Sequence, residues 1–119
     1  MTEDKKRILQ ERVAALHEKY CKQLPGKYHD IEESWREYQT DFSSPVYIEK
    51  FYRLIHTLKG TAATFGFNKQ ADICFDIQKL LIDAKENNAV LAEDSTPLID
   101  GFLIELKTHI NTPADDIGH

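Results

Sequence analysis

The stretch "SPVYIEKFYRLIHTLKGTAATFG", residues 44–66, has the pattern of one amphipathic helix with clear ends. Ser44 followed by Pro45 is typical of an N-cap with proline at the first helical position, and Gly66 is typical of a helix end. At about 100° per residue, four apolar side chains between these ends fall within a sector of about 60°. They are Phe51, Ile55, Leu58 and Ala62. The stretch therefore predicts a helix that packs on a core through this one face.

His56 lies on the other side of the same predicted helix, roughly 130° from the centre of the core face. Gly60 follows one turn later, although an interior glycine costs about 1 kcal/mol relative to alanine. A solvent-facing histidine is common on any helix, but it does not explain the glycine. A partner that must approach the imidazole closely does need a small residue there. Lys59 would then place a positive charge beside an arriving anion.

Helical spacing of apolar residues continues on both sides of this stretch. We expect helices over residues 4–22, 28–38, 44–65 and 69–86, and a fifth that starts at "DSTP", residues 94–97. The sequence "LPGK", residues 24–27, separates the first two, and Asn68 is the expected cap of the fourth. The first helix carries Ile8, Leu9, Val13, Leu16 and Tyr20, and the fifth carries Leu98, Ile99, Phe102, Leu103, Leu106 and Ile110.

Short connections between amphipathic helices favour antiparallel neighbours. The predicted fold class is an all-α, antiparallel up-and-down four-helix bundle with an additional N-terminal helix. The bundle is expected to take up residues 1–112, and the polar residues 113–119 to form a flexible C-terminal tail.

The composition is that of a globular protein with a single modest core, because 41% of the 119 residues are hydrophobic and 29% are charged. The net charge of −5 argues against nucleic acid as a partner. No apolar run approaches the roughly 18 residues of a membrane span, and the charged start "MTEDKKRILQ" does not resemble a secretory signal. We expect a cytoplasmic protein in which Cys21 and Cys74 are reduced thiols.

The residues "HTLKG" and the later Gly66 resemble the motif of the histidine-containing phosphotransfer (HPt) domain of multistep two-component phosphorelays. That motif is histidine, any residue, a hydrophobic residue, lysine and glycine, then five variable residues and a second glycine. His56, Leu58, Lys59, Gly60 and Gly66 fit it without exception. The motif spans 11 residues, but the similar order of helices extends over most of residues 9–111.

The resemblance also suggests a role for Gln78, which follows His56 by 22 residues. Family members often carry a glutamine there that hydrogen-bonds the imidazole from the neighbouring helix. On that helix we expect Ile73, Ile77, Leu80 and Ala84 to form the core face, with Gln78 beside it. An ordinary glutamine at the border of the core is the alternative. The residues expected to line the partner-docking surface are Tyr52, Gly60, Ala63, Ala71, Phe75 and Ile82.

The resemblance implies a phosphohistidine carrier rather than an enzyme with its own ATP-dependent kinase activity. His56 would accept a phosphoryl group from a receiver-domain aspartyl phosphate and pass it to another receiver aspartate, with Lys59 near the phosphoryl oxygens and Gln78 orienting the ring. The partners would be receiver domains of response regulators or of a hybrid sensor kinase. They would bring the Mg²⁺, so no cofactor of its own is expected. We expect a monomer.

Two other kinds of protein remain possible from the sequence. One is a helical module that docks partners without being phosphorylated, although such a module needs no nucleophile. The other is a metal or redox bundle, but no glutamate has a histidine three residues later, as di-iron bundles require. His17 with Cys21, and Glu105 with His109, have ligand spacing without companion ligands. We expect these to be solvent-side residues and no metal site.

Overall fold

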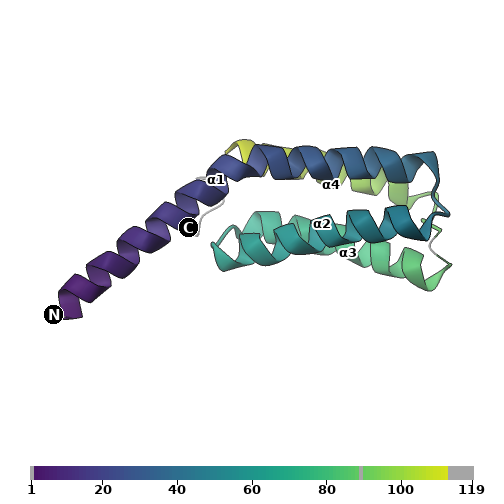
Figure 1. Ribbon diagram of the computed structural model, residues 1–119. Coiled ribbons are helices and arrows are strands. Elements are labelled where there is room, and N and C mark those ends of the chain that lie inside the picture. The colour runs from purple at the N-terminus through teal and green to yellow at the C-terminus, as the bar shows by residue number, and fades with distance from the viewer. Residues whose placement is uncertain (1, 89, 113–119) are drawn as a thin grey trace.

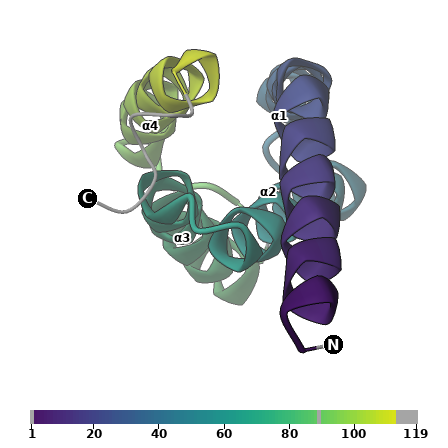
Figure 2. The same cartoon turned by 90° about the vertical axis from the view of Figure 1, so that its left-hand side faces the viewer.

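The computed structural model describes residues 2–88 and 90–112, which fold into four helices joined by short loops. They are α1 (Thr2–Thr40), α2 (Pro45–Thr64), α3 (Asn68–Glu86) and α4 (Ser95–Asn111). The carboxyl-terminal half of α1 packs on α2 and α4, and α3 packs on the same two helices (Figure 1). Seen along the bundle, the four helices surround a common core (Figure 2). The predicted all-α bundle is confirmed.

The expected break at residues 24–27 is wrong, because α1 continues through Pro25 without interruption. The additional N-terminal helix and the first bundle helix are therefore one helix of 39 residues. Proline removes one helical hydrogen bond and favours a kink, and α1 changes direction between its two halves (Figure 1). Leu24 and Tyr28 are both buried on either side of the proline. Tertiary packing of these two side chains outweighs the tendency of Pro25 and Gly26 to end the helix.

The amino-terminal half of α1 projects beyond the other three helices (Figure 1). Its apolar spacing correctly predicted a helix, but the bundle buries only the last of the five apolar residues, Tyr20. The other four are 45% to 61% exposed, namely Ile8, Leu9, Val13 and Leu16. The helix is long enough to leave the bundle, since 39 residues at about 1.5 Å each reach about 58 Å. The whole molecule measures 58 × 22 × 22 Å.

Both ends of α2 are formed as the sequence predicts. The Ser44 side chain accepts a hydrogen bond from the backbone N–H of Tyr47 at 3.2 Å, and Pro45 occupies the first turn. At the other end Gly66 has φ of +82°, a value that favours glycine. This turn lets the N–H of Phe67 reach the carbonyl of Ala62 at 2.8 Å. The helix that carries His56 is thus fixed at both ends.

The core is built from one face of each helix and includes all four predicted core residues of α2. Two aromatic side chains of the core pair their polar groups across the bundle. The Tyr28 hydroxyl donates to the Leu103 carbonyl at 3.1 Å, and Trp35 Nε1 donates to the Asp100 carboxylate at 2.8 Å. These two bonds join α1 to α4, so the aromatic rings are buried while their polar ends are satisfied.

Two details of α3 differ from the expectations. Phe67 precedes the first residue of α3 in the cap position, where Asn68 was expected, and no side chain caps that end. Leu81 is buried where Leu80 was expected; Leu80 is only partly buried against the core. Each one-position shift reflects a helix phase that side-chain periodicity fixes only approximately. The predicted tail, residues 113–119, lies outside the described residues.

Candidate functional site

The site lies on the outer face of α2, where His56 is exposed to solvent. Ile55 and Leu58, on either side of it in sequence, are buried at 0% and 2% exposure. The core therefore holds the helix in one rotational setting, and this setting turns the imidazole outward. The predicted position of His56 relative to the core face is confirmed.

Gln78 of α3 reaches the imidazole from the neighbouring helix. Its side-chain nitrogen Nε2 lies 3.3 Å from Nδ1 of His56 and 2.8 Å from the hydroxyl oxygen of Tyr52. Gln78 is only 7% exposed, and its role in orienting the imidazole stays a prediction. The Nδ1 atom faces this amide, and Nε2 is the ring nitrogen that remains for a partner.

Tyr52 lies one turn before His56 on α2, and the two rings are nearly parallel. Their centroids are 5.8 Å apart and their planes differ by 8°. On the Tyr52 ring, the ammonium of Lys85 from α3 lies 3.8 Å from the centroid, a cation–π contact. Tyr52 is thus held between the imidazole and a lysine, as well as by its bond to Gln78.

Lys85 also forms an ion pair with Glu49 at 2.5 Å, and Glu49 pairs with Arg53 at 3.1 Å. Hydrogen bonds from Lys85 and then Arg53 hold the pKa of the Glu49 carboxyl below its usual 4.5. Sequence analysis did not single out Glu49 or Lys85. The available signal was spacing, because Glu49 precedes His56 by seven residues and Lys85 follows Gln78 by seven, or two helical turns in each case.

Lys59 extends over the exposed ring of Phe75, with 5.4 Å between its ammonium and the ring centroid. Lys79 approaches the same ring at 4.9 Å and pairs with Asp76 at 3.4 Å. Lys59 itself makes no ion pair with any residue in the described ranges. Its charge is therefore available for an anion that arrives beside His56.

Gly60 leaves open space beside the histidine, since a Cβ atom built on it would meet nothing within 4 Å. The glycine is therefore not required by helix packing in the protein alone. Among the other residues expected to dock a partner, Ala63, Phe75 and Ile82 are exposed and Ala71 is half-buried. The role of these four residues in docking stays a prediction.

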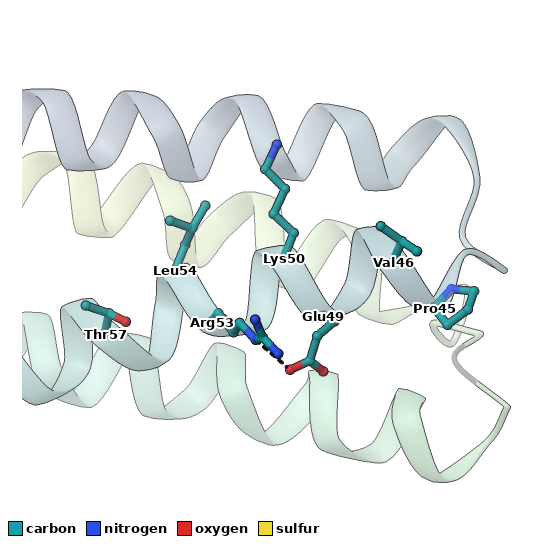
Figure 3. A pocket seen from close by; sticks show the side chains of 7 residues that line it. All are labelled: Pro45, Val46, Glu49, Lys50, Arg53, Leu54 and Thr57. Carbon is teal, nitrogen blue, oxygen red and sulfur yellow. Dashed lines mark hydrogen bonds and ion pairs between the residues drawn. The ribbon is translucent and has the colours of Figure 1, made fainter.

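Figure 3 shows a hollow on the surface of α2. It is lined by Pro45, Val46, Glu49, Lys50, Arg53, Leu54 and Thr57. His56 is not among these lining residues, and it stands on the helix surface. An exposed histidine on a long helix suits a macromolecular partner better than an enclosed small molecule.

The two cysteines and the candidate metal pairs lie apart from this site. Burial raises the pKa of the Cys74 thiol to about 12 and also raises the pKa of Cys21, so both thiols disfavour the reactive thiolate. His17 Nδ1 lies 4.0 Å from Cys21 Sγ, and the His17 ring stacks on Phe67. In the part of the chain that the structure describes, no three potential ligands gather in a metal-binding group.

The fold and the site together define a small helical bundle that presents a histidine on the outer face of one helix, within hydrogen-bond distance of a glutamine on the next. The family model described as "Hpt domain" matches residues 9–111. The chain belongs to this family. Hpt domains act in phosphotransfer in two-component signalling, where they interact with receiver domains.

The chain is also similar to the chemotaxis protein CheA of Listeria monocytogenes and of Listeria innocua. Each match is 25% identical over 89 residues and covers 75% of this chain. It covers only 14% of each relative, so this chain corresponds to a small part of those proteins. Across residues 2–88 and 90–112, no helix has the length and apolar character needed to cross a membrane.

Proposed function

We propose that this chain carries a phosphoryl group on His56 between two receiver domains. The observation that carries the proposal is the pairing of an exposed imidazole on α2 with the buried amide of Gln78 on α3. A fixed imidazole with one nitrogen turned outward can act as a nucleophile near neutral pH. The family supports phosphotransfer; the residue and the direction of transfer are our proposal.

In the proposed step, Nε2 of His56 forms a bond to the phosphorus of a receiver aspartyl phosphate. The proton of Nε2 passes to water as this bond forms, which frees the nitrogen lone pair for the attack. The bond between phosphorus and the aspartate oxygen breaks, and the carboxylate leaves with the electron pair. The reverse sequence on a second receiver regenerates the free histidine. Lys59, which has no acidic partner within the described residues, would stabilise the charge on the phosphoryl oxygens.

The chain's own residues supply position and charge, whereas the receiver would supply the aspartate and its Mg²⁺. We therefore propose a carrier without a cofactor and without ATP-dependent kinase activity. The open space beside Gly60 and the exposed side chains of Ala63, Phe75 and Ile82 would accommodate the surface of the receiver.

The test is to mix the chain with a receiver domain whose aspartate carries a radiolabelled phosphoryl group. We expect label on the chain that is lost in acid and retained in base, as a phosphoramidate requires. His56→Gln should abolish the labelling and keep the helical content. The matched control is His29→Gln, because His29 is also helical and exposed but has Glu33, not glycine, one turn later.

Undiminished labelling of His56→Gln would refute the assignment of the nucleophile. A chain that binds the receiver but never acquires label would instead be a docking module.

A further inference from the structure

The amide of Gln78 joins two side chains of α2 through a single nitrogen. Its Nε2 atom lies within hydrogen-bond distance of both the Tyr52 hydroxyl and Nδ1 of His56, at 2.8 and 3.3 Å. Its oxygen Oε1 is buried and has no hydrogen-bond partner among the described residues. The Gln78 amide therefore has its N–H donors toward Tyr52 and His56 and its oxygen toward the interior.

The alternative orientation of the amide is less favourable. An amide nitrogen carries two N–H donors, and the present orientation gives both of them an acceptor. Exchanging oxygen and nitrogen would bury two donors at the position where Oε1 now has no partner. Buried N–H groups without acceptors are rarer and costlier than a carbonyl with unused lone pairs. The geometry therefore favours a nitrogen that donates to both neighbours.

This orientation determines which nitrogen of His56 carries the proton. Because Nδ1 accepts from Gln78, the neutral ring holds its proton on Nε2. The Tyr52 hydroxyl contributes to this preference, because it accepts the second N–H of Gln78, which would otherwise be buried without an acceptor in the present orientation too. Without that hydroxyl, the exchanged orientation becomes more populated, and in it the Gln78 oxygen accepts a hydrogen bond from a protonated Nδ1 of His56.

We propose that Tyr52 is a positioning residue that acts through Gln78: its hydroxyl keeps the amide nitrogen toward His56 Nδ1 and so prolongs the life of the phosphorylated ring. The proposal rests on the proposed function, because it assumes that His56 carries the phosphoryl group. It extends the role of Tyr52 beyond that of a surface residue at a docking site.

The chemical reason lies in how the phosphoryl group leaves. Water or a carboxylate attacks phosphorus, the N–P bond breaks, and its electron pair returns to Nε2. This is easiest when Nδ1 is protonated, because the ring then leaves as neutral imidazole. An N–H donor directed at Nδ1 opposes that protonation. The Tyr52–Gln78 pair therefore favours the long-lived, neutral phosphohistidine.

The ring of Tyr52 is held independently of its hydroxyl. It stacks on the His56 ring and lies under the Lys85 ammonium, which is itself fixed by Glu49. Tyr52→Phe keeps the ring and these contacts and removes only the hydroxyl. Tyr47→Phe is the matched control, because Tyr47 is a partly buried tyrosine of the same helix that belongs to no contact with Gln78.

The first measurement is the ¹⁵N NMR spectrum of the His56 ring in the unphosphorylated chain, recorded in alkaline solution so that the neutral ring is observed. We expect Nε2 to be the protonated nitrogen in the unmodified chain and in Tyr47→Phe. Tyr52→Phe should raise the ratio of Nδ1-protonated to Nε2-protonated ring by roughly two- to tenfold, the effect of losing one hydrogen bond. Gln78→Glu, which cannot donate, should raise it further.

The second measurement is the half-life of phosphohistidine in water, which should be roughly two- to tenfold shorter in Tyr52→Phe than in Tyr47→Phe. A spectrum with the proton on Nδ1 in the unmodified chain, or an unchanged ratio in Tyr52→Phe, would overturn the proposal. So would equal half-lives. A chain that takes up no label at all would refute the proposed function instead, and the spectrum would still decide the role of Tyr52.

Discussion

At the scale of single residues, Gly60 has no structural reason to be glycine, since a Cβ atom there meets nothing and the helix would gain from alanine. Gly66 differs, because its φ of +82° strains any residue with a side chain. Of these two glycines, Gly60 is the one that the fold does not require, and its place one turn after His56 is why we propose that it serves the close approach of a partner.

Gly60→Ala should raise the free energy of unfolding by up to about 1 kcal/mol, because the penalty for an interior glycine is removed. Gly60→Gln should melt no lower than the unmodified chain but accept phosphate from a receiver far more slowly, since its side chain stands beside His56. Small phosphodonors should be affected less. Melting temperature and both transfer rates should be measured together. Normal transfer by Gly60→Gln would place the docking surface elsewhere, and unfolding would mean that the glycine serves packing.

Lys59→Ala should slow transfer at least tenfold, the effect of losing about 1.4 kcal/mol of charge stabilisation. The fold should persist, because the ammonium lies over the exposed Phe75 ring and forms no ion pair with a residue that the structure describes. Lys79→Ala is the control, since it removes a cation from the same ring but from a lysine already paired with Asp76. Equal transfer rates in the two variants would show that Lys59 has no special part in the reaction.

At the scale of the helices, Glu49 links α2 to α3 through Lys85. The pKa of the Glu49 carboxyl is lowered in the folded chain from its ordinary value of 4.5. The ion pair therefore stabilises the fold fully at pH values above 4.5, and this stabilisation is lost as the pH falls through the lowered pKa. Glu49→Gln should therefore have a slightly lower melting temperature at neutral pH. The loss of unfolding free energy should be less than about 1 kcal/mol, because the pair is partly solvated. The difference should vanish in acid.

The measurement is the melting temperature of Glu49→Gln and of the unmodified chain as a function of pH. Glu18→Gln is a suitable control, since Glu18 pairs with Lys22 within a single exposed helix and links no elements. If the melting-temperature difference between Glu49→Gln and the unmodified chain grew as the pH fell, the Glu49–Lys85 ion pair would not be what stabilises the contact between α2 and α3.

The projecting half of α1 should contribute little to the stability of the bundle. Residues 2–16 are all exposed, and the next buried side chain is Tyr20, which stacks on Phe65. Deleting residues 2–16 should change the free energy of unfolding by no more than about 0.5 kcal/mol. Tyr20→Ala should cost about 3 kcal/mol or more. Urea unfolding would check both. A loss of several kcal/mol on deletion would mean that this half packs on something, a second copy included.

At the scale of the molecule, a structural feature could be predicted from the sequence wherever a single local pattern determines it. The caps of α2 and the outward position of His56 follow from Ser44, Gly66 and one apolar stripe. The course of α1 through Pro25 could not be predicted, because burial of Leu24 and Tyr28 opposes the local proline signal. The same holds for Lys85, whose place over Tyr52 depends on how α3 is set against α2.

The central claim is that phosphate passes through His56 from one receiver to another. The most direct measurement loads the chain with labelled phosphate from a first receiver, removes that receiver, and adds a second, unlabelled one. The account predicts that label leaves the chain and arrives on the second receiver in equal amount, and that His56→Gln breaks the relay while His29→Gln does not. Label that reaches the second receiver equally well with His56→Gln, or never leaves the chain, would contradict it.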